Sequence, residues 1–116
     1  MANLKYDKEI AALVVIDPCN DFISEGGKMQ LKRHGIHQLI VIGLLAHTCV
    51  ESTVRFAVEL GYEVTMVKDA TASFTDEQMH AALHINIPNY ASAMVTTNEV
   101  VDSISSLTTL GISARP

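Results

Sequence analysis

Four short apolar runs, rich in β-branched residues, alternate along the chain with segments of helical character. No other feature of the sequence restricts the possible folds as much as this alternation. The runs cover residues 11–16, 39–43, 63–67 and 92–96. They are almost continuously apolar, which is typical of parallel strands covered by helices on both faces. We therefore expect an α/β fold with an open parallel sheet of about four strands and helices on both faces, in the order β-α-β-α-β-α-β-α.

The helical segments carry signals for where they begin and end. A helix over residues 48–60 is followed by Gly61, and a short one over 29–34 by Gly35, because glycine readily adopts the left-handed conformation of a C-cap. Two further helices begin with capping-box pairs, the first running to about residue 85 and the second to Gly111. These pairs are Thr75 with Gln78 and Thr96 with Glu99.

Length and composition exclude several classes of protein. A chain of 116 residues with 48% apolar content supports one core, so we expect a single domain over residues 1–116. The formal net charge is −5 and no basic cluster is present, which argues against nucleic acid as a partner. The longest apolar run, residues 39–46, is much shorter than the ~20 residues of a membrane span. Two cysteines and a polar beginning of the chain indicate a cytoplasmic protein.

Two candidate catalytic residues follow the first two predicted strands. Asp17 comes directly after the first strand, and Cys49 lies at the first turn of the helix after the second. The carboxyl ends of parallel strands share one edge of a sheet, which is where ligands bind in open α/β folds. The positive end of a helix stabilises a thiolate, and a nearby carboxylate can accept the thiol proton. The alternative is that Cys49 is a small buried apolar residue and Asp17 a turn residue before Pro18.

Several motifs, in this order, resemble those of the isochorismatase-like cysteine hydrolases. The resemblance covers nearly the whole chain and is more specific than one short motif. Its elements are Val-Val-Ile-Asp-x-x-Asn-Asp-Phe over residues 14–22, Gly-x-x-x-x-x-Cys-Val over 43–50, Gly-Tyr at 61–62 and Asp-Ala-Thr-Ala-Ser over 69–73.

The resemblance implies a mechanism. Members with the cysteine cleave C–N bonds of small amide or ureido compounds through a thioester, whereas isochorismatase itself lacks the cysteine and cleaves a different bond. Carried onto this chain, Cys49 is the nucleophile and Asp17 the general base. The backbone N–H groups of Leu45 and Cys49 form the oxyanion hole, beside a non-proline cis bond between Leu44 and Leu45. No cofactor and no bound metal are implied, since the metal ligands of metal-dependent relatives lie in a block absent here.

The chain departs from this family in one respect, because the catalytic lysine is not found. In complete members it lies in a central block of two β-α units, which would fall here between about residues 28 and 30. Lys28 matches the family's opening loop, and Lys68 belongs to the Asp-Ala-Thr segment, so neither replaces it. We expect an impaired hydrolase whose first strand, residues 11–16, becomes an open edge and drives homo-oligomer formation. The alternative is a catalytically inactive remnant acting as an interaction or oligomerisation module.

Other polar residues have simpler interpretations. His47 is expected to be a turn residue facing solvent or a pocket rim, and His80 and His84, four residues apart, to form a polar helix flank without a third metal ligand. Glu51 and Arg55 are spaced for a surface ion pair. Asp69 is expected to cap a following segment rather than line a pocket.

Overall fold

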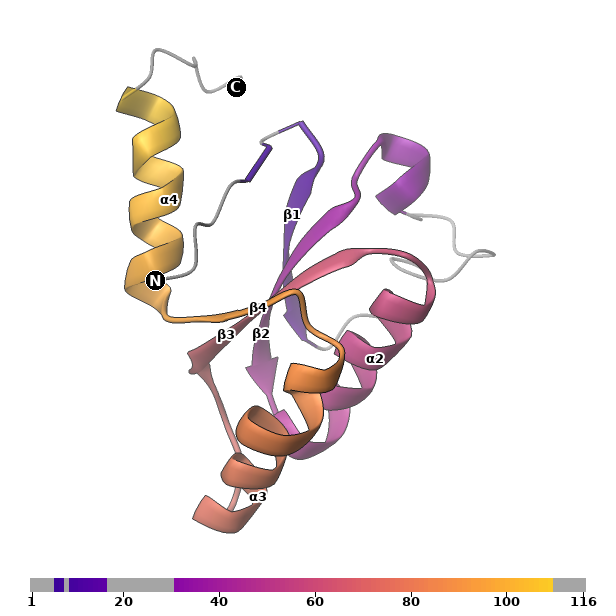
Figure 1. The fold of residues 1–116 in the computed structure, drawn as a ribbon, viewed down its shortest axis with the longest axis vertical. Coiled ribbons are helices and arrows are strands. Elements are labelled where there is room, and N and C mark those ends of the chain that lie inside the picture. Colours follow the sequence, from indigo (N-terminus) through magenta and orange to yellow (C-terminus); the bar gives the residue numbers. More distant parts are fainter. Residues whose placement is uncertain (1–5, 8, 17–30, 110–116) are drawn as a thin grey trace.

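The chain forms one parallel sheet in which the strands lie in sequence order, β1-β2-β3-β4 (Figure 1). The computed structural model describes residues 6–7, 9–16 and 31–109. The α/β fold with four parallel strands is confirmed. The strands are β1 (Ala11–Ile16), β2 (Gln38–Leu44), β3 (Glu63–Ala72) and β4 (Ala93–Val95).

Helices connect the strands as the capping signals predict. The short helix before β2 ends at Gly35, with φ +79°, and α2 is followed by Gly61, with φ +86°. Both capping boxes form: Gln78 N–H donates to Thr75 Oγ1, and Thr96 N–H donates to the Glu99 carboxylate. The helical elements are η1 (Leu31–His34), η2 (Ala46–Val50), α2 (Glu51–Glu59), α3 (Asp76–His80), η3 (Ala81–Asn86), η4 (Ile87–Asn89) and α4 (Thr97–Thr109).

β3 is longer than its apolar run, extending to Ala72 instead of ending at Val67. Its last residues pair with the end of β2, Gly43 with Thr71 and Leu44 with Ala72. The register shifts between Val41 and Gly43, so β3 bulges before this pairing. The extension brings the end of β3 beside the end of β2, where the candidate site lies.

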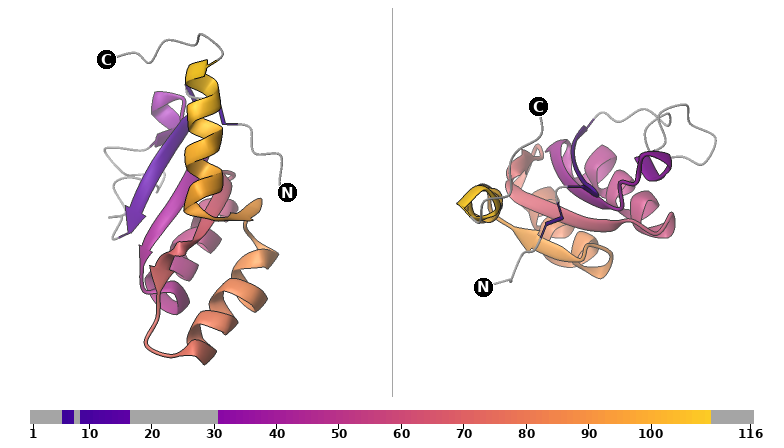
Figure 2. Two further views of the ribbon diagram at one scale, coloured as in Figure 1. Left: turned by 90° about the vertical axis from the view of Figure 1, so that its left-hand side faces the viewer. Right: turned by 90° about the horizontal axis from the view of Figure 1, so that it is seen from above.

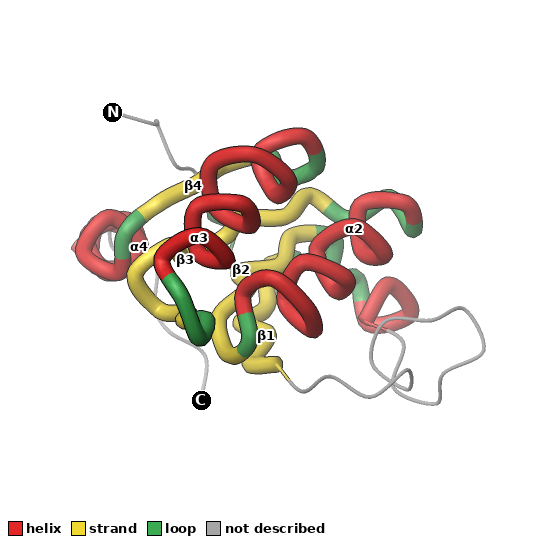
Figure 3. Tube along the Cα trace, turned by 90° about the horizontal axis from the view of Figure 1, so that it is seen from below, coloured by secondary structure: helices red, strands yellow, loops and turns green. Residues whose placement is uncertain are grey.

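One face of the sheet carries the larger core. Alternate residues of β2 and β3 point to this face, and α2 with η3 and η4 covers it (Figure 3). The buried cluster is Leu39, Val41, Ala46, Val50, Val54, Ala57, Tyr62, Val64, Met66, Ala82, Leu83 and Ile87.

The opposite face is covered by α4, which stands on the other side of the sheet from α2 (Figure 2). Its buried cluster is smaller and consists of Tyr6, Ile40, Val67, Val95 and Val100. Among the strands, β3 is the one that α4 contacts most. Helices therefore cover both faces as predicted, but the second face incompletely.

The expected ion pair on α2 is wrong. Glu51 instead accepts a hydrogen bond from Asn86 Nδ2 at 3.4 Å, and the Arg55 guanidinium lies over the Tyr90 ring, 5.2 Å from its centre. Both side chains thus fasten α2 to the segment around η4. Among the described residues, no helix has the length and apolarity that a membrane span requires.

Candidate active site

The carboxyl ends of β1, β2 and β3 meet at one edge of the sheet. Ile16, the last residue of β1, pairs with Gly43, and Leu44 ends β2 beside Ala72 of β3. The peptide bond between Leu44 and Leu45 is cis, as the resemblance implies. Asp17, the residue after β1, lies outside the described residues. This edge is where the sequence predicts the catalytic residues.

Cys49 lies in η2, the π-helical turn that joins the end of β2 to α2. Its side chain is exposed and not disulfide-bonded, so the interpretation of Cys49 as a small buried apolar residue is wrong. Thr48 Oγ1 lies 3.7 Å from Cys49 Sγ as a hydrogen-bond donor, and Thr53 Oγ1 donates to the Cys49 carbonyl at 2.7 Å. The thiol is therefore open to a small molecule while its backbone is fastened to α2.

His47 connects η2 to the end of β3. Its ring Nδ1 and Ser73 Oγ are 2.8 Å apart, and its ring meets Phe74 edge to face with centroids 6.3 Å apart. The side chain is partly buried, so His47 is a fixed residue at the rim rather than a freely solvated one. The sequence offered no signal for this contact, because nothing in the pattern shows that β3 extends as far as residue 72.

Two apolar side chains stand exposed around this edge. Leu44 is 57% exposed and Phe74 is 79% exposed, although both are large and apolar. Thr71 has a buried hydroxyl for which the described structure shows no hydrogen-bond partner. Leu44 and Phe74 thus form exposed apolar surface near the ends of β2 and β3.

Asp69 caps the start of α4, the role that the sequence predicts for it. Its carboxylate accepts hydrogen bonds from the Thr97 side chain and from the Thr97 N–H, both at 2.8 Å, at the start of α4. These bonds lower the pKa of Asp69 from its ordinary value of 3.8. Asp69 therefore links β3 to the start of α4 by hydrogen bonds.

The two described lysines interact with groups other than Cys49. Lys32 Nζ donates to the Leu60 carbonyl and lies over the Tyr62 ring, 5.0 Å from its centre. This places Lys32 at the carboxyl end of α2, whereas Cys49 precedes the amino end. Lys68 lies on β3 with its side chain exposed. Lys28, set aside already from its motif, lies outside the described residues.

The histidine pair on the third helical segment shows no metal-site geometry. The rings of His80 and His84 stack with centroids 5.1 Å apart. Within the described part of the chain, no group of three or more His, Cys, Asp or Glu side chains is arranged to hold a metal ion.

Comparison with known proteins gives a consistent assignment. The family described as "Isochorismatase domain" matches residues 25–99. The isochorismatase family protein YwoC of Bacillus subtilis (strain 168) is 34% identical over 76 residues, which are 66% of this chain and 40% of YwoC. The ureidoacrylate amidohydrolase RutB of Rhizobium rhizogenes is 29% identical over 75 residues, 65% of this chain and 30% of RutB.

Solved structures agree with these sequence relatives. An isochorismatase-like hydrolase from Alkaliphilus metalliredigens has a TM-score of 0.60 at 26% identity, covering 66% of this chain and 41% of that one. The chain spans about two fifths or less of the length of these relatives. With more than half of its residues matched by the family's domain, this chain belongs to the isochorismatase family.

Proposed function

We propose that Cys49 is the nucleophile of an amidohydrolase-type site acting on a small amide or ureido compound. Asp17 takes the thiol proton, the sulfur bonds to the substrate's carbonyl carbon, and the backbone N–H groups of Leu45 and Cys49 stabilise the oxyanion. The C–N bond then breaks, and Asp17 returns the proton to the leaving nitrogen. Water attacks the resulting thioester, which releases the acid and restores the thiol.

The observation that carries this proposal is the position of Cys49. It is an exposed thiol in the first helical turn after β2, four residues beyond the cis bond between Leu44 and Leu45. The relative RutB is a ureidoacrylate amidohydrolase, which supports the C–N bond as the target. A free thiol nucleophile also suits a reducing compartment, and we place the chain in the cytoplasm.

We propose further that activity is weak, because Lys32 lies at the far end of α2 and the charge of Lys68 acts on Asp69 and Glu99 near the start of α4. A carboxylate without a balancing cation disfavours the thiolate beside it, so both attack and proton return lose support. The expected turnover is therefore about a hundredfold or more below that of a complete amidohydrolase site.

The test is ammonia release from a panel of simple amides and ureido acids by the full chain. We expect slow release that Cys49→Ala abolishes and that Glu59→Gln, an exposed residue at the other end of α2, retains. Release unchanged in Cys49→Ala would contradict Cys49 as the nucleophile. Turnover as fast as that of a complete amidohydrolase would contradict the impairment.

The second candidate function is an inactive interaction or oligomerisation module. It is favoured by β1, which pairs only with β2 in the described sheet and so forms an edge. Thiol reactivity separates the two candidates. Rapid alkylation of Cys49 by iodoacetamide at neutral pH, measured in Cys19→Ala, indicates a working nucleophile, whereas the rate of an ordinary thiol favours the module.

A further inference from the structure

His47 joins the turn that carries Cys49 to the end of β3. Its Nδ1 atom lies 2.8 Å from Ser73 Oγ, and its ring meets the Phe74 ring edge to face, with the centroids 6.3 Å apart. Cys49 follows two residues later in the same turn, η2. A side chain close to the candidate nucleophile is therefore fixed to a different strand.

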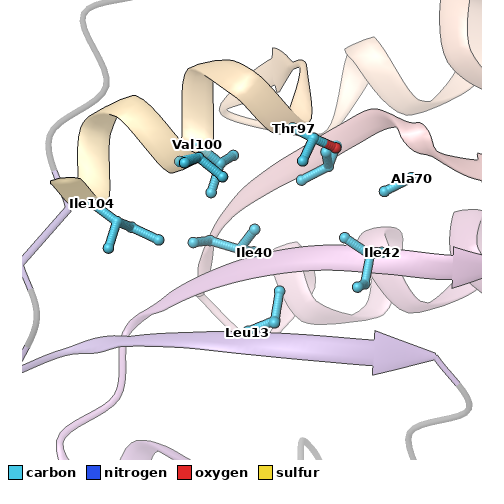
Figure 4. Close-up of a pocket in the computed structure, with 9 residues that line it drawn as sticks. Leu13, Ile40, Ile42, Ala70, Thr97, Val100 and Ile104 are labelled. Atoms are coloured by element: carbon cyan, nitrogen blue, oxygen red, sulfur yellow. The ribbon is translucent and has the colours of Figure 1, made fainter.

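The extension of β3 is what brings Ser73 to η2. Ala72, the last residue of β3, pairs with Leu44, so Ser73 begins directly beside the end of β2. Side chains alternate between the two faces of a strand, and Ala70 lines a groove on the α4 side of the sheet (Figure 4). Ser73, three positions later, has its hydroxyl on the opposite side, where η2 and α2 lie.

η2 is a single π-helical turn, a rare form of helix that occurs mostly in such short pieces. The side chains of Ala46 and Val50 are buried in the main cluster and hold its inner side. Thr53 Oγ1 donates to the Cys49 carbonyl at 2.7 Å, but this bond stays within the same helical segment. The bond of His47 runs instead to the end of β3, so it is a directional contact between the turn and the sheet.

We propose that His47 is a positioning residue that acts through Ser73. Their hydrogen bond holds η2 so that the backbone N–H groups of Leu45 and Cys49 face the substrate's oxyanion. This role rests on the proposed function, which assigns those N–H groups to the oxyanion. A displacement of about 1 Å can cost about 100-fold in rate, so even a small movement of η2 matters.

Hydrogen bonding is sufficient for this role, and proton transfer by His47 is not needed. A serine hydroxyl can donate to a bare Nδ1 or accept from a protonated one, so the bond forms with either tautomer and with the charged ring. Asparagine keeps a hydrogen-bonding atom as many bonds from the backbone as Nδ1, but its amide does not act as a base at neutral pH. His47→Asn therefore separates a positioning role from an acid–base role.

The experiment measures by NMR how tightly propionaldehyde, labelled with ¹³C at its carbonyl, adds to Cys49 in the full chain with Cys19→Ala. The sulfur bonds to the aldehyde carbon, the carbonyl π bond breaks, and the thiol proton passes to the oxygen. That oxygen takes the place of the substrate's oxyanion, so the adduct reports on the N–H groups. Alkylation by iodoacetamide needs no oxyanion hole and reports on the thiol alone.

We expect Ser73→Ala and His47→Leu each to weaken the adduct about tenfold and to change the alkylation rate less than about twofold. His47→Asn should keep the adduct within about threefold of the parent chain. The matched control is Ser103→Ala, since Ser103 is also partly buried and its Oγ donates at 2.8 Å, to the Glu99 carbonyl of α4. It should change both measurements less than about twofold.

An adduct that neither Ser73→Ala nor His47→Leu weakens overturns the inference and leaves Cys49 as the nucleophile. A loss in His47→Asn as large as in His47→Leu overturns it too, and so does an equal loss of alkylation, because the effect would then lie on the thiol. If Ser73→Ala does not fold by circular dichroism, the two His47 variants decide. If the parent chain forms no adduct that Cys49→Ala removes, the hydrolase proposal fails together with this inference.

Discussion

The two faces of the sheet are built from the same strands but are completed to different degrees. On the face covered by α2, η3 and η4, twelve apolar residues form one buried cluster. On the α4 face, five residues form the cluster, while Leu13, Val101 and Ile104 remain about half or more exposed. Among the described elements, the difference lies in the number of helices over each face rather than in the strands.

This difference divides the roles of the two faces. The complete face carries η2 and α2, and therefore holds Cys49 in place. The incomplete face carries the exposed apolar residues Leu13, Val101 and Ile104. We expect the first to determine the stability of the single chain and the second to determine what the chain associates with.

The largest effect should come from Leu39→Ala on the complete face. Leu39 is 1% exposed within the main cluster, and such substitutions typically cost about 2–5 kcal/mol because a cavity remains. Urea denaturation followed by far-ultraviolet circular dichroism measures the free energy of unfolding. A loss below about 1 kcal/mol would show that this face does not hold the chain together.

A smaller difference in stability is expected between substitutions of two valines that lie on helices at opposite faces of the sheet. Val54 of α2 is 0% exposed, whereas Val100 of α4 is 9% exposed in the smaller cluster. We expect Val54→Ala to cost about 2 kcal/mol and Val100→Ala about 1 kcal/mol, because Val100 has fewer neighbours to lose. Equal losses in the free energy of unfolding for the two variants would show that the two faces contribute equally to stability.

The sequence predicts the complete face better than the incomplete one. Residues 11–16 form a strand with the predicted bounds, and Gly61 ends α2 as expected, because apolar runs and caps are local signals. The extension of β3 to Ala72 was missed, since residues 68–72 are mixed in polarity and are held by pairing with β2. The incomplete cover by α4 could not be predicted, because it depends on where a helix settles across a sheet.

In the candidate site, local motifs predicted the position of Cys49 and the cis bond, but they did not predict which residues contact this region. The Gly-x-x-x-x-x-Cys-Val motif places Cys49 at a helix start, and its exposure there agrees with a reactive role. The contact between His47 and Ser73 joins residues 26 positions apart and has no pattern of its own. The role of Asp17 stays a prediction, since that residue lies outside the described part of the chain.

The attachment of α4 should weaken in acid. Hydrogen bonds from Thr97 lower the pKa of Asp69 from 3.8, and hydrogen bonds from Thr96 lower that of Glu99 from 4.5. A carboxyl whose pKa is lower in the folded chain stabilises it above the unfolded value, and this contribution is lost as the pH falls through the folded value. We therefore expect the free energy of unfolding to decrease below about pH 4.5, and to decrease less steeply in a variant with Asp69→Asn and Glu99→Gln. An equally steep decrease in that variant would mean that these two groups do not cause it.

The smallest effect on the single chain should come from Leu13→Ala, the counterpart of Leu39→Ala on the neighbouring strand. Leu13 pairs in register with Ile40 and points to the α4 face, where it is 61% exposed. Because little of its surface leaves water on folding, the substitution should change the free energy of unfolding by less than about 0.5 kcal/mol in dilute solution. A cost near that of Leu39→Ala in dilute solution would show that Leu13 is already covered within one chain, and the two faces would then be equally complete.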